Sequence, residues 1–354
     1  MKKLIAAALT SVGLLVGAQA QAAEIELTLA HSWPKGFPIF ATSVDDYATM
    51  VSEMSNGRIE IRVDSRNKHK SAFGIFDFVK TGQYDIGQSA AYYYGGKEPD
   101  ALFFTTMPFG MTALEQYAWF HEGGGLDLAN QVFAKHDIEV MTGGNTTMQM
   151  GGWFRKEINS VDDLKGLKMR IPGFGGKVLA GVGAVPTNIP PGELFQALER
   201  GTIDALEWVG PSLDLRMGFH KIAPFYYTGW HEPSTELMYF FNKSTMDSLP
   251  AWARSTLLNA AKLTGFNMTV QSQHESAQNW ATMKSEFPNI VVKNFPADVI
   301  SALRKSNADL IEAERSRSEL AAQIIESQSD YLTSVRRWTE IGDWSYLANV
   351  AAGK

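Results

Sequence analysis

The chain has 354 residues, of which 45% are hydrophobic and 20% are charged, a composition that supports a large core and more than one compact domain. Its formal net charge of -6 and its lack of basic runs argue against nucleic acid as a partner. It has no cysteine, which excludes disulfides, thiolate metal sites, cysteine nucleophiles and a lipid-anchored cysteine.

Residues 1–22 have the three parts of a secretory signal peptide. Lys2 and Lys3 give a positive start, and an apolar stretch from Leu4 to Val16 follows. Cleavage is expected after one of the small-residue sites at 18–20 and 20–22. No later segment reaches the roughly 18 apolar residues of a membrane-spanning helix. We therefore expect an exported, soluble protein whose net charge moves from -6 to -8, because the peptide carries two lysines and no acidic residue.

Strand and helix patterns alternate along the chain and predict an α/β fold with mainly parallel strands. Strands are expected at 24–30, 58–63, 147–154, 167–171, 185–189, 236–241 and 289–295, with a further one shortly before Tyr94. Helices are expected at 40–55, from about 177, at 191–200 and at 250–287. A helical pattern then runs from 297 to 338, a length that indicates helices bridging two lobes or supporting a dimer, with room for one break.

Two segments of the sequence resemble each other. FDFVKTGQYDIGQS (76–89) aligns without gaps to FQALERGTIDALEW (195–208), with matched phenylalanine, glycine and aspartate. Each reads as a helix that ends at a glycine, followed by a turn and a strand. The match is either a coincidence of a common connection or the sign of two similar lobes that share a cleft. In the second case Gln88 and Glu207 end equivalent strands, and ligands in open α/β sheets bind beyond such strand ends.

Several polar residues stand where they could reach that cleft. Arg170 lies near the end of a predicted strand and offers a rigid fork of donors to a carboxylate, although a surface salt bridge would also explain it. Gln149 lies among apolar neighbours and could be a satisfied core amide or an oxygen ligand, and Glu232, between aromatic and proline residues, could be a solvated loop charge or a ligand. Together with Glu207 they would supply the oxygen ligands that hard cations prefer. One tyrosine of the run 92–94 could bind a carboxylate from the first lobe.

The common enzyme motifs are incomplete. Gly173-Phe174-Gly175-Gly176 lacks the third glycine of a dinucleotide fingerprint, since Val178 stands there. His121-Glu122 and His231-Glu232 do not continue into H-E-x-x-H, and no G-x-S-x-G occurs. An exported α/β enzyme is therefore the weaker hypothesis.

Three motifs carry a family resemblance: DDLKGLKMRIPG (162–173), ERGTIDALEWVGP (199–211) and GFHKIAPFYYTGWHEP (218–233). They resemble DctP-type solute-binding proteins, the periplasmic receptors of tripartite ATP-independent (TRAP) transporters, and most closely the metal-dependent branch that binds 2-oxo acids or lactate. The resemblance covers the whole mature chain. It implies a two-lobed periplasmic-binding-protein fold with a hinge between the lobes and long C-terminal helices. It implies a receptor that catalyses nothing and delivers a small monocarboxylate to the small and large TRAP membrane subunits.

Carried over by position, the resemblance also implies the site. Arg170 would pair with the ligand carboxylate, and Tyr93 or Tyr94 would contact the ligand. A sodium or calcium ion would be held by Gln149, Glu207, the backbone carbonyl of Trp208, and Glu232. Gln149, Glu207 and Trp208 would thereby also touch the ligand.

The expected organisation is a signal peptide (1–22), lobe I (23–146 plus 234–287), lobe II (147–233 plus 288–296) and C-terminal helices (297–354) that pack across the lobes or form a homodimer. A larger or aromatic carboxylate in place of a small 2-oxo acid remains an alternative ligand.

Overall fold

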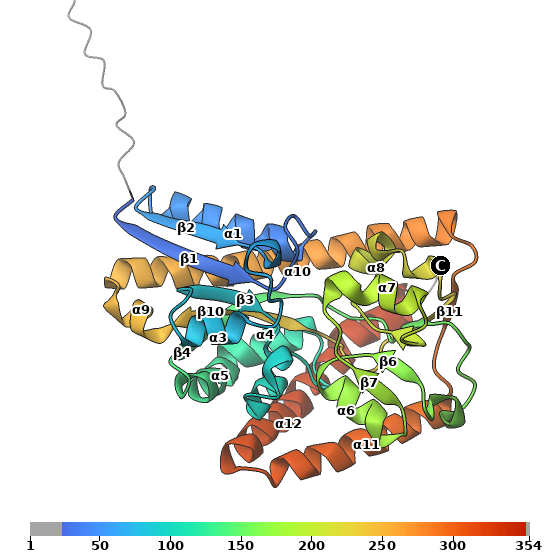
Figure 1. The fold of residues 1–354 in the computed structure, drawn as a ribbon. Coiled ribbons are helices and arrows are strands. Elements are labelled where there is room, and N and C mark those ends of the chain that lie inside the picture. Colours follow the sequence, from blue (N-terminus) through green and yellow to red (C-terminus); the bar gives the residue numbers. More distant parts are fainter. Residues whose placement is uncertain (1–22, 352–354) are drawn as a thin grey trace, which may run out of the picture.

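The computed structural model describes residues 23–351, so the predicted signal peptide lies outside the described residues. Two β-sheets form the framework (Figure 1), one with strand order β2-β1-β3-β10-β4 and one with order β11-β9-β5-β8-β6-β7. The strands of the first sheet are β1 (Ile25–His31), β2 (Ile59–Asp64), β3 (Ile86–Ser89), β4 (Ile138–Asn145) and β10 (Glu236–Asn242). Those of the second are β5 (Gly152–Phe154), β6 (Lys168–Arg170), β7 (Val185–Thr187), β8 (Ala205–Leu206), β9 (Phe225–Tyr227) and β11 (Val291–Lys293). Each sheet is the centre of one lobe.

Strand direction is mixed in both sheets, which corrects the expectation of mainly parallel pairing. In the first sheet β1 pairs in parallel with β2 and β3, but β10 runs antiparallel to β3 and β4. In the second, β5 runs antiparallel to β8 and β9, while the other pairs are parallel. The antiparallel strands β5 and β10 are each the first strand after the chain passes from one sheet to the other. Neither is therefore joined to a preceding strand of its own sheet by a βαβ crossover, which would make the two strands parallel.

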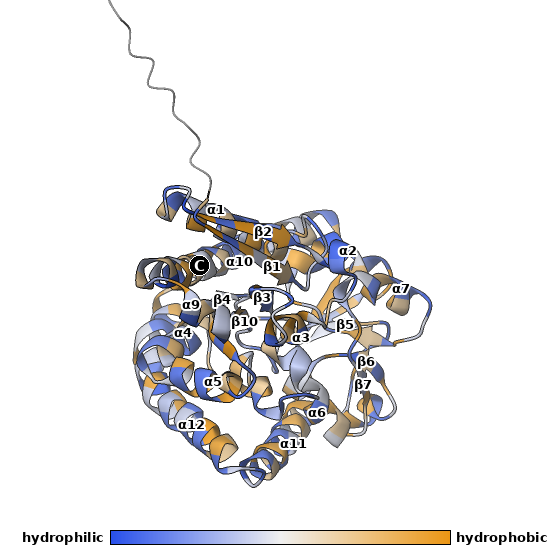
Figure 2. Cartoon of the chain, turned by 60° about the vertical axis from the view of Figure 1, so that its left-hand side comes forward, coloured by the Kyte–Doolittle hydropathy of each residue, from blue (hydrophilic) through white to orange (hydrophobic). Residues whose placement is uncertain are grey.

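Helices cover both sheets and connect them (Figure 1). The helices are α1 (Phe40–Met54), α2 (Arg66–His69), α3 (Ile75–Lys80), α4 (Ala113–Glu122), α5 (Gly125–Ala134), α6 (Gly173–Gly181), α7 (Leu194–Glu199), α8 (Pro211–Met217), α9 (Lys243–Ser248), α10 (Ala251–Glu286), α11 (Ala297–Arg315) and α12 (Glu319–Thr339). The 36-residue α10 packs on β4 and α1 of the first lobe and on α8 of the second. At the other side of the molecule α11 packs on α6, and α12 packs on α4 and α5. Figure 2 shows polar and apolar residues mixed along α11 and α12, as expected of helices with one solvated face.

Three local expectations differ from the structure. The strand expected at 147–154 is confined to Gly152–Phe154, because the backbone turns at Thr147 and Gly152, which have φ of 62° and 114°. Helix α6 begins at Gly173, four residues earlier than expected, although it is rich in glycine. A side chain at Gly176 would meet the Ile171 carbonyl at 2.7 Å, so close packing explains glycine there. The long C-terminal helical pattern has its one break at 316–318.

The two segments that resemble each other in sequence have the same local structure. Helix α3 leads through Gly82 to β3, and α7 leads through Gly201 to β8. The two glycines have nearly equal positive φ values of 70° and 71°, a conformation that costs glycine little. The resemblance of the segments is therefore structural, and Glu207 directly follows β8 as the alignment predicts.

The two lobes are closed against each other. Arg66 Nη2 lies 3.2 Å from Glu193 Oε1 across the cleft mouth, in a partly exposed pair. Deeper, the ring of Phe40 lies 6.0 Å from that of Trp208. On the far side Phe103 packs against Phe174 with ring centroids 5.0 Å apart. Polar residues between the lobes are consequently shielded from water.

Among residues 23–351 no helix is both long and apolar enough to cross a bilayer.

Candidate functional site

Main-chain hydrogen bonds tie four distant segments together where the two lobes meet. Gln149 N donates to the carbonyl of Glu232 at 3.0 Å, and Met150 N donates to the carbonyl of Val209 at 2.8 Å. Glu207 N donates to the carbonyl of Arg170 at 2.9 Å. The segments that carry Gln149, Arg170, Glu207 and Glu232 are thus fixed relative to one another by backbone contacts, which is how a rigid site is built.

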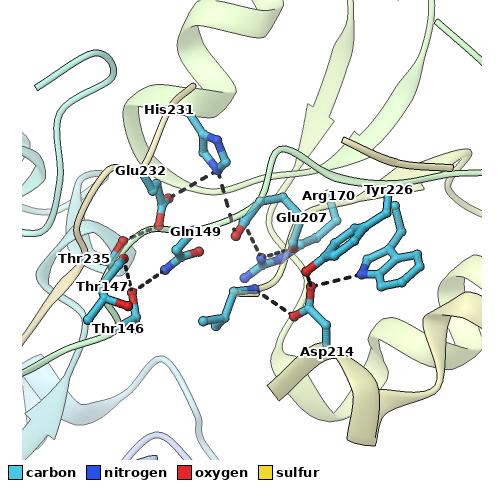
Figure 3. Close-up of polar contacts among 12 residues, drawn as sticks. Thr146, Thr147, Gln149, Arg170, Glu207, Asp214, Tyr226, His231, Glu232 and Thr235 are labelled. Atoms are coloured by element: carbon cyan, nitrogen blue, oxygen red, sulfur yellow. Dashed lines mark hydrogen bonds and ion pairs between the residues drawn. The ribbon is translucent and has the colours of Figure 1, made fainter. Parts of the chain in front are cut away.

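Arg170 and Glu207 form a buried ion pair at the centre of this region (Figure 3). Arg170 Nη1 lies 3.1 Å from Glu207 Oε2 and 2.5 Å from the Glu207 carbonyl oxygen. Arg170 Nη2 and Glu207 Oε1 are both buried and have no hydrogen-bond partner. Buried charged atoms are normally hydrogen-bonded, so Nη2 is available to donate to an anion and Oε1 is available to a cation or a donor.

Two further buried oxygens without hydrogen-bond partners face the same place. Gln149 Nε2 donates to Thr146 Oγ1 at 2.8 Å, which leaves Gln149 Oε1 free. Glu232 Oε2 accepts from Thr235 Oγ1 at 2.6 Å, which leaves Glu232 Oε1 free. In both cases the second side-chain atom is held by a threonine hydroxyl, so the free oxygen has a defined direction.

His231 also belongs to this group, although sequence reasoning had considered it only as part of an incomplete H-E-x-x-H motif. Its Nε2 atom lies 3.8 Å from Glu207 Oε1 and 3.9 Å from Glu232 Oε1, as the dashed lines in Figure 3 show. Neither ring nitrogen has a hydrogen-bond partner. The three residues can offer ligand atoms that all lie within 4.8 Å of one another.

Burial controls the protonation of these groups. It lowers the pKa of His231 to about 4, so this imidazole is neutral at pH 7. Burial, reinforced by the neighbouring Glu207, raises the pKa of Glu232 to about 7. Burial also raises the pKa of Glu207 well above its ordinary value, although Arg170 acts in the opposite direction. A positive charge between the two carboxylates would offset the cost of ionising both of them.

The residues present fit a hard cation. Gln149, Glu207 and Glu232 each present one buried side-chain oxygen without a hydrogen-bond partner. Such oxygens suit sodium and calcium, whereas thiolates are absent from the chain.

The aromatic residues expected at the site lie at different depths. The Trp208 ring contacts Phe37 and Phe40 of the first lobe, and the Arg170 guanidinium carbon lies 5.4 Å from its centre. Burial raises the pKa of Tyr93 to about 12, and the nearby charges of Arg170, Glu207 and Glu232 also influence this pKa.

Tyr94 packs in the core of the first lobe. Its ring packs on Phe76 and Phe240 of the first-lobe core, and its hydroxyl lies near Ser32 and Ser89. Tyr92, the remaining tyrosine of the run, lies near the same charged groups as Tyr93, and its ring lies so close to Gly173 that a Cβ there would come within 2.5 Å of it.

Comparison with known proteins gives the family. The family described as bacterial extracellular solute-binding protein, family 7 (DctP), matches residues 29–316. A monocarboxylate 2-oxoacid-binding periplasmic protein of a Nostoc species is 34% identical over 93% of this chain and 90% of its own length.

Solved structures agree. A TRAP periplasmic solute-binding protein from Pseudoalteromonas atlantica with bound sodium and pyruvate is 54% identical, covers 93% of this chain and 99% of its own, and has a TM-score of 0.91. One from Colwellia psychrerythraea with bound calcium and pyruvate has the same identity and TM-score, and covers 93% of this chain and all of its own.

These relatives confirm the two-lobed fold with long C-terminal helices and the interpretation as a binding protein instead of an exported enzyme. With a match across most of the chain, the protein belongs to family 7 of the bacterial extracellular solute-binding proteins, the DctP family, which includes periplasmic receptors of TRAP transporters.

Proposed function

We propose that the protein is the extracytoplasmic receptor of a TRAP transporter and binds a small monocarboxylate, a 2-oxo acid such as pyruvate or the 2-hydroxy acid lactate, together with a sodium or calcium ion. The observation that carries this proposal is the set of buried, unpartnered atoms around one ion pair: a guanidinium nitrogen on Arg170 and oxygens on Gln149, Glu207 and Glu232. The relatives with bound pyruvate and either cation support it.

Each residue then has a defined part. Arg170 keeps Nη1 on Glu207 and uses Nη2 for the ligand carboxylate. Gln149, Glu207, Glu232 and the Trp208 carbonyl hold the cation. A bound cation supplies the positive charge that lets an anionic ligand and two carboxylates share one buried site.

The first lobe contributes a tyrosine. Of Tyr93 and Tyr94, Tyr93 is the better candidate, because the charges of the three site residues all influence its pKa. The hydroxyl of Tyr94 instead lies near two first-lobe serines. The rings of Phe37 and Phe40 against Trp208 leave an apolar wall for the short carbon chain of the ligand.

Closure of the two lobes around the ligand is part of the proposal. We assign 23–146 plus 234–287 to lobe I, 147–233 plus 288–296 to lobe II, and 297–354 to the C-terminal helices. The site residues are almost fully shielded in the closed form, so the ligand must enter while the lobes are apart. The Arg66–Glu193 pair bridges the cleft mouth and would separate on opening.

Delivery requires partners outside this chain. We propose that residues 1–22 direct export to the periplasm and that the loaded receptor hands its ligand to the small and large membrane subunits of the transporter.

We also propose a homodimer, because the described end of the chain exposes large apolar side chains that a monomer leaves in water: Trp338, Ile341, Trp344, Tyr346, Leu347 and Val350. Light scattering on the mature protein and on a chain ending at Thr339 tests this. A dimer that the truncation converts to a monomer is expected, and a monomeric mature protein contradicts it.

Calorimetry with a panel of ligands tests the proposed function. Pyruvate, longer 2-oxo acids, lactate and the aromatic acid picolinate are titrated into protein saturated with calcium, saturated with sodium, or stripped with chelator. We expect tight binding of the small 2-oxo or 2-hydroxy acids only when a cation is present. Preferential binding of the aromatic acid would favour the alternative ligand class, and binding unaffected by chelator would reject the cation.

A further inference from the structure

A third buried carboxylate stands directly behind the proposed cation site. Asp214, in the first turn of α8, is 1% exposed and takes no part in the contacts described so far. Its Oδ1 atom accepts a hydrogen bond from Val209 N at 3.1 Å. Its Oδ2 atom accepts from Trp153 Nε1 and from the Tyr226 hydroxyl, both at 2.9 Å (Figure 3). The carboxylate is thus held by three neutral donors from three parts of the second lobe.

These contacts fix the segment that carries two proposed cation ligands. Val209 follows Glu207 and Trp208, and its N–H is bound by Asp214 while its carbonyl accepts from Met150 N. The rings that hold the other carboxylate oxygen, Trp153 and Tyr226, are themselves stacked at 3.9 Å. Asp214 therefore fixes the Trp208–Val209 peptide, and because N–H and C=O are opposed in a trans peptide, the Trp208 carbonyl, a proposed cation ligand, is directed away from Asp214.

The charge of Asp214 is not balanced locally. Among residues 23–351 no lysine, arginine or histidine forms an ion pair with it, so only neutral donors stabilise the carboxylate. Burial raises the pKa of Glu207, the Arg170 charge opposes this shift, and the Asp214 charge reinforces it, so Asp214 is close enough to influence the proposed cation ligand electrostatically. The region accordingly holds three buried carboxylates, those of Glu207, Glu232 and Asp214, against a single guanidinium, and a bound monocarboxylate adds a further negative charge.

We propose that Asp214 is a positioning residue that orients the 207–209 segment and, through its unpaired buried charge, makes the site prefer a divalent cation such as calcium over sodium. This inference rests on the proposed function, because it assumes the cation site. Its physical basis is that the Coulomb energy between a fixed charge and a bound ion is proportional to the charge of the ion. Removing the Asp214 charge therefore costs a divalent ion about twice as much binding free energy as a monovalent ion. A change of geometry alone would not produce this ratio.

The experiment must separate the charge of Asp214 from its hydrogen bonds. In Asp214→Asn alone, the new amide N–H would face the Trp153 N–H, and two donors would oppose each other. We therefore use Trp153→Phe as the background, which removes that donor and keeps the stacked ring. Asp214→Asn added to this background still accepts from Val209 N, and its amide can donate to the Tyr226 oxygen. The single variant retains the carboxylate and the double variant does not, so their difference isolates the charge.

The readouts are the dissociation constants of calcium and of sodium, measured by calorimetry or by tryptophan fluorescence, without ligand and with saturating pyruvate. Trp153→Phe is expected to leave both constants within about threefold of the parent and to keep the preference for calcium. In the double variant the fold-loss for calcium is expected to be about the square of the fold-loss for sodium. Equal fold-losses, or a sodium preference in the parent, would overturn the proposal.

Two further results keep the test decisive. If Trp153→Phe lowers the calcium preference as much as the double variant does, the charge is not responsible, and the proposal fails. If the double variant does not fold, Asp214→Asn is measured in the parent background instead, because its amide has the length of the carboxylate and its oxygen can still accept from Val209 N. A parent that binds neither cation would reject the proposed function itself, which distinguishes that failure from failure of the Asp214 inference alone.

Discussion

Replacement of Arg170 by lysine separates ligand binding from charge pairing. The guanidinium is fully buried and makes its ion pair with Glu207 through Nη1 only, at 3.1 Å from Oε2. A lysine keeps one positive charge, so Glu207 retains an ionic partner. It cannot present a second, rigidly placed donor toward the ligand, because an ammonium group is a point charge and not a planar fork. The substitution therefore removes the function of Nη2 while it preserves the charge of the site.

The structure sets the size of both effects. The substitution loses the Nη1 bond to the Glu207 carbonyl at 2.5 Å and the long Nε contact to the Ile189 carbonyl at 3.4 Å. At roughly 1 kcal/mol net for each such bond, the free energy of unfolding should fall by about 1–3 kcal/mol. Loss of a buried, hydrogen-bonded partner of the ligand carboxylate should cost roughly 2–5 kcal/mol of binding. That corresponds to a roughly 30- to 4000-fold weaker affinity.

The assay is calorimetric titration of pyruvate at saturating cation, with chemical denaturation of the ligand-free protein as the stability control. Arg66→Lys is the matched control, since Arg66 lies at the cleft mouth in a partly exposed pair worth little. We expect Arg66→Lys to bind nearly as the parent does. Pyruvate affinity within threefold of the parent in Arg170→Lys would remove Arg170 from the ligand site.

Three other substitutions have defined outcomes. Glu207→Gln keeps a side-chain oxygen but removes the negative charge, so cation affinity should fall at least about tenfold in calorimetry, and loss of the ionic partner of buried Arg170 should also lower the free energy of unfolding of the cation-free protein; an unchanged cation affinity would exclude the Glu207 carboxylate as a ligand. Burial raises the pKa of Glu236 to about 7, above its ordinary value of 4.5, so the folded state holds this proton more tightly than the unfolded state and the protein loses stability as pH rises from about 4.5 through 7. Glu236→Gln should therefore gain about 3 kcal/mol of unfolding free energy relative to the parent between pH 4 and pH 8, and a difference independent of pH would contradict the assignment. A side chain at Gly229 would place its Cβ 1.9 Å from the Gln149 carbonyl oxygen, so Gly229→Ala should lose about 1–3 kcal/mol of stability and weaken cation binding; denaturation and calorimetry that match the parent would contradict this.

The sequence was most informative where function depends on strand ends. Arg170 ends β6 and Glu207 follows β8, and both were expected at a cleft because the strand pattern and the repeated helix–glycine–strand segment are local features. Gln149 was expected within a strand and instead lies in an irregular segment before β5. It still reaches the site because its backbone pairs with Glu232, a contact across 83 positions that no local pattern encodes.

The structure also brings in residues that sequence reasoning missed. His231 was noticed only as part of an incomplete metalloprotease motif, and its burial beside two carboxylates depends on closure of the lobes. Asp214 gave no signal at all, because its partners Trp153, Val209 and Tyr226 are brought together by the second sheet and helix α8. In both cases the information lies in tertiary contacts between segments that are far apart in the chain.

The coupling between cation and ligand tests the central claim most directly. Pyruvate affinity is measured by calorimetry on the mature protein at a series of free calcium concentrations, from chelated to saturating, and the series is repeated with sodium. If the cation and the carboxylate occupy one buried site, the logarithm of the apparent association constant should rise with unit slope against the logarithm of cation concentration and then reach a plateau. A slope of zero with both cations, with pyruvate still bound, would contradict the account.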